Sequence, residues 1–191
     1  MPILEADRVV HRLTAPHGKA LPAIGAAFPG TVTDGRLDRA KLATIVYGDN
    51  DALVRLEAIL HPLFFREERR FIARARAQRR SMVAVDIPLL FEIGAEGNKD
   101  AVIVVSAPAM IQRARVMRRR GMTLARLAAI LAHQMPDREK RRRADFVLRT
   151  GGARREALRS LKAIVDSLMR SPRRGSIHKP LRRASFKTRT F

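Results

Sequence analysis

The chain has 191 residues, no Cys, and 39 Lys and Arg against 18 Asp and Glu, which gives a formal net charge of +21. Without Cys, disulfides, thiol nucleophiles and cysteine metal sites are excluded, and the composition fits a reducing compartment. No apolar run reaches the length of a membrane span, and Glu5, Asp7 and Arg8 stand where a signal peptide would be apolar. We therefore expect a cytoplasmic protein that is long enough for one sizeable core.

Apolar runs and helical patterns alternate along the chain. A short strand at 3–4 leads into a helix at 8–14, and further strands are expected at 82–86, 101–105 and 146–148. We expect helices at about 38–47, 52–60, 63–78, 109–120, 123–134, 137–143 and 154–169. Asp38, Asn50-Asp51 and Thr123 are the expected caps, and His61-Pro62 is expected to separate two helices. Strands separated by helices predict βαβ units and a parallel sheet.

The strand at 82–86 ends in an acidic loop. Four of its five residues are apolar, and Asp86-Ile87-Pro88 then ends the run. Ligands of open α/β folds bind outside the carboxyl ends of such strands, so Asp86 could lie beside a site. The alternative is that Asp and Pro are present only because both residues end strands well.

Residues 170–191 form a basic tail. They contain eight Lys or Arg and no acid, and Pro172, Gly175 and Pro180 interrupt any periodicity. This composition predicts a disordered extension of a domain at 1–169. The tail could bind nucleic acid or an acidic membrane surface, or it could be a solvated appendage.

An ordered set of short motifs resembles the dephospho-coenzyme A kinases over nearly all of residues 1–169. The set is Glu5-Ala6-Asp7, His61-Pro62, Asp86-Ile87-Pro88-Leu89-Leu90-Phe91-Glu92, the spacing of Gln112, Arg115 and Arg119, Gln134, and Ala144-Asp145-Phe146. The resemblance implies a three-layer, P-loop NTPase-like α/β fold with a parallel sheet, a helical coenzyme A-binding segment and a lid at about 115–143. It also implies transfer of the γ-phosphoryl of ATP, bound as MgATP with Mg²⁺, to the 3′-hydroxyl of dephospho-coenzyme A. That transfer is the last step of coenzyme A synthesis, and its partners are small molecules rather than a membrane.

The sequence departs from this family at the phosphate-binding loop. A P-loop needs G-x-x-x-x-G-K-[ST], but around the one Gly-Lys pair, Gly18-Lys19, Leu13 replaces the first Gly and Ala20 replaces the hydroxyl residue. In the family the loop and the first, central strand precede the motif that corresponds here to Glu5-Ala6-Asp7. The resemblance therefore implies a chain that lacks this strand and is inactive as written.

The missing strand would leave its two neighbours with unpaired backbone groups. Each such group costs about 1–3 kcal/mol when buried, against a total stability of about 5–15 kcal/mol for a domain. We therefore expect a marginal or aggregation-prone chain. A start codon assigned too late, a truncated relic, and a fragment completed by another chain all stay open as explanations.

The resemblance also implies roles for individual residues. Asp7 would be the general base toward the ribose hydroxyl, as a kinase requires, although it could instead be a helix N-cap. Arg115 and Arg119, four residues apart on one expected helix face, would neutralise the transferring phosphoryl, or form a solvated basic face. The implied substrate-binding residues are His11, His61, Pro62, Leu89, Leu90, Phe91 and Glu92. The implied ATP-binding residues are Arg115, Arg119, Lys140, Gly151 and Gly152.

The sequence also bears on a metal site and on nucleic-acid binding. The five His are scattered without metal-ligand spacing, so we expect no metal site made by the protein alone. The charge of +21 allows an alternative, a basic nucleic-acid-binding protein built on a relic kinase fold, whose binding would depend steeply on salt. Aromatic residues make up only 5% of the chain and Trp is absent, which argues against stacking on bases.

Overall fold

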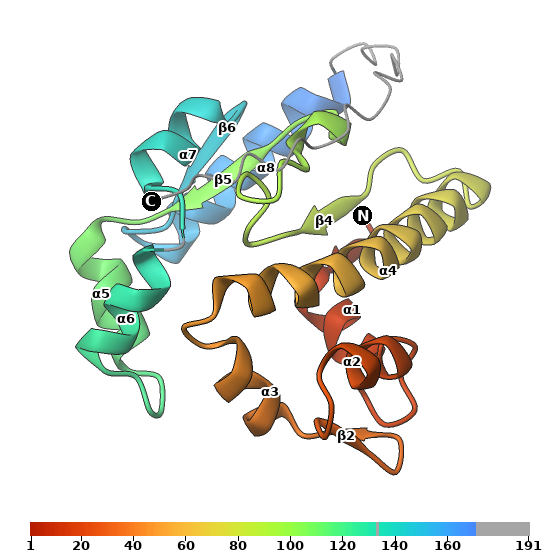
Figure 1. Ribbon diagram of the computed structural model, residues 1–191. Helices are drawn as coiled ribbons and strands as arrows, with labels where there is room; N and C mark the ends of the chain where they lie inside the picture. The colour runs from red at the N-terminus through yellow and green to blue at the C-terminus, as the bar shows by residue number, and fades with distance from the viewer. Residues whose placement is uncertain (133, 171–191) are drawn as a thin grey trace. The chain divides into compact units, whose positions relative to one another are not determined.

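The computed structural model describes residues 1–132 and 134–170. The chain forms two compact units, Met1–Pro88 and the part from Leu89 onward, and each is described by itself (Figure 1). Apart from Arg170, the predicted basic tail lies outside the described residues. Within the described part of the chain, no helix has both the length and the apolar character needed to cross a membrane.

The first unit contains two pairs of strands and four helices among its described residues. Its elements are β1 (Ile3–Glu5), α1 (Ala6–Leu13), α2 (Leu21–Ala27), β2 (Val32–Thr33), β3 (Arg36–Leu37), α3 (Arg39–Val46), α4 (Asn50–Ala77) and β4 (Ala84–Asp86). Strands β1 and β4 are parallel, with Leu4 opposite Val85 and Glu5 opposite Asp86. The core of this unit lies between β1, α1, α2 and α4, where Val9 and Ile24 are fully buried.

The β2–β3 hairpin was not predicted from the sequence. Its turn is Asp34-Gly35, and both residues have positive φ, 50° and 68°. Two successive residues with positive φ define the type I′ turn, for which Asp-Gly is a preferred pair. The signal was therefore present, but the flanking strands of two residues each are too short to show alternation.

Helix α4 runs through Pro62, so the prediction of two helices separated at His61-Pro62 was wrong. A proline inside a helix removes one backbone hydrogen bond and costs about 3 kcal/mol or more. Buried side chains on both sides of the proline, Ala52 and Phe64, anchor the two halves in the same core. The N-cap of α4 is Asp49, whose carboxylate accepts from the backbone N–H of Ala52 at 2.9 Å, and not Asn50-Asp51.

The second unit contains a second parallel pair. Its elements are η1 (Glu96–Asn98), β5 (Ile103–Ser106), α5 (Ala109–Met117), α6 (Leu124–Ala132), α7 (Asp137–Arg143), β6 (Phe146–Arg149) and α8 (Arg154–Arg170). Strands β5 and β6 pair from Ile103 opposite Phe146 to Ser106 opposite Arg149, and α8 runs alongside β6 (Figure 1). Thr123 caps α6 as predicted, because its hydroxyl accepts from the N–H of Arg126.

The described parallel strands form one ladder in each unit, β1–β4 in the first and β5–β6 in the second. The expected absence of a first, central strand stays a prediction. Val105 in β5 is 63% exposed, whereas strands of complete parallel sheets are buried on both faces.

Candidate active site

The carboxyl ends of β1 and β4 form an acidic edge in the first unit. Glu5 lies opposite Asp86 in the parallel register, and Asp7 follows in the first turn of α1. His11 lies one turn further along α1, so Asp7 and His11 share the exposed face of this helix. The structure thus brings two of the predicted site residues together at a strand end, which is where ligands of α/β folds bind.

Asp7 does not cap α1. The N-cap is Glu5, whose carboxylate pairs with Arg8 Nε at 2.8 Å. The interpretation of Asp7 as an N-cap was therefore wrong. Its exposed carboxylate is available for contact with a ligand. A carboxylate in the first turn also stabilises the helix through the helix dipole.

His61 lies on α4, the helix that packs on α1. Its ring meets the ring of Phe65 edge to face at a centroid distance of 6.3 Å, and Phe65 meets Phe64 in the same way at 5.4 Å. These aromatic contacts fix the imidazole on a half-buried surface, with Pro62 exposed beside it. The predicted contact of His61 and Pro62 with substrate stays a prediction.

A depression of about 460 Å³ lies at the carboxyl ends of β5 and β6 in the second unit. Gly151 and Gly152, both predicted to bind ATP, line it together with Ser106, Pro108 and Asp137. A Cβ at Gly151 would meet the Pro108 ring at 2.5 Å, so a residue without a side chain is needed there. We take this depression as the candidate nucleotide site because of its place at the strand ends.

Ser106 and Asp137 line the same depression and were not predicted from the sequence. The Ser106 hydroxyl donates to Asp137 Oδ2 at 3.0 Å, and Arg141 Nε approaches the same oxygen at 2.9 Å. Asp137 therefore joins the end of β5 to the start of α7. The strand-end rule that drew attention to Asp86 would also have found Ser106, which ends the next strand.

The two predicted lid arginines are arranged differently from each other. Arg115 on α5 donates to the Thr150 carbonyl at 2.7 Å and approaches its hydroxyl at 3.4 Å, so it borders the candidate nucleotide site. Helix α5 ends at Met117, and Arg119 lies in the following turn with an exposed side chain. The prediction that both arginines share one helix face was therefore wrong, while their roles in phosphoryl transfer stay predictions.

Glu92 and Lys140, predicted to bind different substrates, contact each other. Lys140 Nζ lies 2.7 Å from Glu92 Oε1, which also accepts from the backbone N–H of Met135 at 2.9 Å. Burial acts to raise the pKa of Glu92, but these hydrogen bonds and the charge of Lys140 outweigh it, so the pKa lies below its ordinary value. The neighbouring Phe91 is buried, and Leu89 and Leu90 are more exposed.

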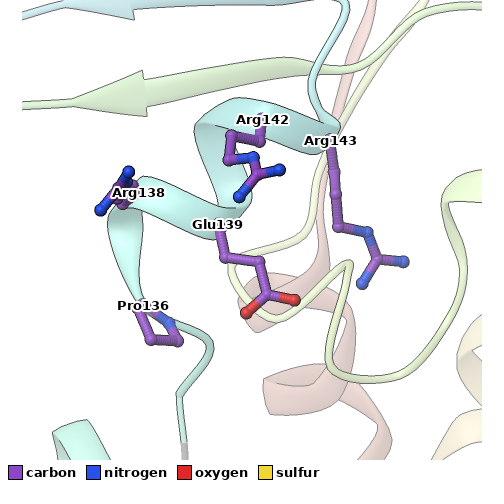
Figure 2. A pocket seen from close by; sticks show the side chains of 5 residues that line it. All are labelled: Pro136, Arg138, Glu139, Arg142 and Arg143. Atoms are coloured by element: carbon purple, nitrogen blue, oxygen red, sulfur yellow. The ribbon is translucent and has the colours of Figure 1, made fainter.

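A second depression, of about 630 Å³, lies along α7 (Figure 2). It is lined by Pro136, Arg138, Glu139, Arg142 and Arg143. Figure 2 shows Glu139, Arg142 and Arg143 extending from one side of the helix and Arg138 extending away from them. This depression is larger, but it is lined by charged side chains of one helix and does not lie at the strand ends, so it suits a nucleoside less well.

The residues of the described chain do not fit a resident metal ion. No group of three or more Asp, Glu or His in the described ranges could hold one. The expectation of Mg²⁺, bound as MgATP, stays a prediction.

Parallel strands separated by helices define an α/β protein, and they are consistent with a fold of the P-loop NTPase type. The family model described as dephospho-CoA kinase matches residues 1–156, and the chain belongs to that family.

Relatives named dephospho-CoA kinase are similar over most of the chain. The one from Mesorhizobium japonicum is 52% identical over 168 residues, which cover 88% of this chain and 84% of the relative. The one from Paramagnetospirillum magneticum is 54% identical over 173 residues, which cover 91% of this chain and 81% of the relative.

Two solved structures are also similar. The crystal structure of TT1252 from Thermus thermophilus matches with a TM-score of 0.69 and 35% identity, covering 87% of this chain and 84% of that one. The dephospho-CoA kinase from Campylobacter jejuni matches with a TM-score of 0.63 over 88% of this chain and 85% of that one. At 23% identity, this second match bears on the fold alone.

Proposed function

We propose that this protein acts in the dephospho-CoA kinase reaction, in which the γ-phosphoryl of ATP is transferred to the 3′-hydroxyl of dephospho-coenzyme A. The observation that carries the proposal is the family match across residues 1–156. The composition without Cys suits a reaction in the reducing cytoplasm.

Asp7 is proposed as the general base. Asp7 comes shortly after β1, whose last residue, Glu5, lies opposite Asp86 at the end of β4. Its side chain is exposed and does not cap α1. A carboxylate in hydrogen-bond reach of the 3′-hydroxyl orients that oxygen for attack and accepts its proton. His11, on the same face of α1, is proposed to contact the substrate beside it.

The depression at the ends of β5 and β6 is proposed to hold the adenosine part of ATP. The close approach of Gly151 to Pro108 supports this proposal, because the depression has no side chain at the point where one would clash with the Pro108 ring. Arg115 and Arg119 are proposed to pair with phosphate oxygens, for which the planar guanidinium is suited. Arg115 also holds the Thr150 carbonyl, and so positions the residue that precedes Gly151.

His61 and Pro62 of the first unit are proposed to contact dephospho-coenzyme A. In the second unit, the exposed Leu89 and the half-buried Leu90 are proposed to contact it as well. The apolar side chains would contact the pantetheine part of the substrate, and His61, fixed by Phe65, would offer a hydrogen bond. These proposed contacts with dephospho-coenzyme A do not involve a phosphate loop.

Phosphoryl transfer is proposed to need a loop that these 191 residues do not contain. No G-x-x-x-x-G-K-[ST] stretch is present, and this loop supplies the backbone N–H groups and the Lys that surround the phosphates. The chain by itself is therefore expected to bind dephospho-coenzyme A and to turn it over poorly or not at all.

A calorimetric titration of the 191-residue chain with dephospho-coenzyme A tests the proposal. We expect saturable, one-to-one binding that a short DNA duplex does not displace at about 0.15 M salt. The opposite pattern, with no dephospho-coenzyme A binding and DNA binding that weakens steeply with salt, would favour the nucleic-acid alternative.

A further inference from the structure

Two acidic residues fasten the segment 89–98 to helix α7. Glu92 pairs with Lys140 at 2.7 Å, and Glu96 pairs with Arg143. Lys140 and Arg143 are three positions apart on α7 and therefore lie on neighbouring turns of one face. The segment and the helix are thus joined by two ion pairs in parallel.

Apolar and backbone contacts reinforce the same junction. The guanidinium of Arg143 lies over the Phe91 ring at 4.9 Å from its centroid, a cation–π contact. The backbone N–H of Met135, just before α7, donates to Glu92 Oε1 at 2.9 Å. Every one of these contacts joins the segment that carries Leu89 and Leu90 to α7 or to the residues that lead into it.

The Glu92–Lys140 pair is the most protected of these contacts. Its side chains are 15% and 17% exposed, so water and salt screen it less than a surface pair. Glu92 Oε2 and Glu96 Oε2 are both buried without a hydrogen-bond partner in the described part of the chain. Each carboxylate therefore makes its ion pair through Oε1 alone, and the loss of the basic partner would leave a largely buried charge uncompensated.

Helix α7 also borders the candidate nucleotide site. Asp137, its first residue, lines that depression and accepts from Ser106. Lys140 follows one turn later on a helix of seven residues. Helix α7 thus connects the end of β5 with the segment 89–98. Its Asp137 contacts Ser106, and its Lys140 contacts Glu92.

We propose that Glu92 is a positioning residue, whose ion pair with Lys140 fastens the segment 89–98 to α7 and so holds Leu89 and Leu90 in the arrangement that binds dephospho-coenzyme A. This inference rests on the proposed function. It replaces the expectation that Glu92 and Lys140 contact two different substrates directly. Glu92 acts through the segment that carries it, and Lys140 acts through Glu92.

Four variants test this role: Glu92→Gln, Lys140→Met, the double variant, and the exchanged pair Glu92→Lys with Lys140→Glu. Glu139→Gln and Arg138→Met are the matched controls, because both residues lie on α7 and neither is hydrogen-bonded or ion-paired to the segment 89–98 in the described structure. Calorimetry gives the affinity for dephospho-coenzyme A, and hydrogen–deuterium exchange gives the protection of residues 89–98.

The positioning role predicts coupled effects. Each single variant should weaken binding roughly tenfold and raise deuterium uptake in the segment, and the double variant should be no worse than either single one. The exchanged pair should recover part of both losses. The controls should change neither quantity.

Direct contact with the substrate predicts something different. In that case the two single losses would add in the double variant and the exchanged pair would not recover, which would overturn the proposal. Unchanged uptake in both single variants, or raised uptake with unchanged affinity, would overturn it as well. If the wild-type chain binds no dephospho-coenzyme A, the proposed function fails, and deuterium uptake alone then decides whether the segment is fastened by this pair.

Discussion

The guanidinium of Arg115 donates to the backbone carbonyl of Thr150 at 2.7 Å, so α5 holds the loop that leaves β6. The next residue along, Gly151, lines the candidate nucleotide site. An arginine predicted to meet phosphate thus also shapes the wall of the depression. Its removal should affect the site through the loop as well as through charge.

Replacing Arg115 should weaken nucleotide binding more than replacing a neighbouring arginine. Arg115→Met removes a charged donor, an interaction that contributes about 1.5–3 kcal/mol when well protected, and its exposure reduces this to about 1 kcal/mol. We expect a several-fold loss in ATP affinity, measured by titration with a fluorescent ATP analogue. Arg113→Met, which removes an exposed arginine of the same helix, is the control, and an equal loss in both variants would refute a specific role for Arg115.

Asp7→Asn should abolish most phosphoryl transfer in a form of the protein that turns over. A positioned general base contributes about 10²–10⁴-fold to the rate, so kcat should fall by that factor with little change in KM. Asp51→Asn is a matched control, since Asp51 is also an acid in the first turn of a helix and its loss perturbs the helix dipole equally. A kcat that is insensitive to Asp7→Asn would remove Asp7 from the catalytic group.

Gly151→Ala should narrow the nucleotide site and destabilise the protein. The new Cβ would lie 2.5 Å from Pro108 Cδ, and the proline ring cannot swing away as a flexible side chain could. Overpacking of this kind costs about 1–3 kcal/mol, which urea unfolding would detect. Gly97→Ala meets no atom within 4 Å and should leave the free energy of unfolding nearly unchanged. Similar effects of the two substitutions would show that the close approach at Gly151 has no consequence.

The contribution of Glu92 to stability should be lost in acid. Because its pKa in the folded protein lies below the ordinary value, the ionised form is favoured by folding, and this stabilisation is complete above the ordinary pKa of about 4.3. As the pH falls through the lower folded pKa, the carboxylate is protonated and the stabilisation disappears. Lys140 faces Glu92 directly, and the nearby Glu96 and Arg143 pair with each other.

Urea unfolding at about pH 7 and about pH 3 measures this effect. The wild type should exceed Glu92→Gln in stability at the higher pH, and the difference should shrink at the lower one. Glu139→Gln removes the same charge elsewhere on the protein, so its change in stability between the two pH values gives the effect of net charge alone. A difference between wild type and Glu92→Gln that grows toward acid would contradict the assigned direction of the pKa.

Much of the fold could be predicted because its signals are local. The strand 84–86, the strand 103–106 and helix α7 all show in the pattern of apolar and charged residues. The side-chain caps at Asp38 and Thr123 follow from their position before a helix. Pro62 misled the prediction because local chain chemistry disfavours proline inside a helix, whereas the cost is offset by a core that buries Ala52 and Phe64 on either side. That compensation is tertiary and has no local signature.

The candidate site was only partly predictable for the same reason. Strand-end and family reasoning predicted Asp7, Gly151 and Gly152 as site residues, and the structure places them at strand ends or in a depression. The pairing of Glu92 with Lys140 joins residues 48 positions apart and could not be read from spacing. Arg119 does not share a helix face with Arg115, because α5 ends at Met117, before Gly121.

The formation of coenzyme A from dephospho-coenzyme A and MgATP, followed by mass spectrometry, tests the central claim most directly. It should be run with the 191-residue chain and with a version in which a strand and a G-x-x-x-x-G-K-[ST] loop precede Met1. We predict that the loop-bearing version forms coenzyme A, that Asp7→Asn stops it, and that the 191-residue chain forms little or none. A folded, loop-bearing protein that binds both substrates and still forms no coenzyme A would contradict the account.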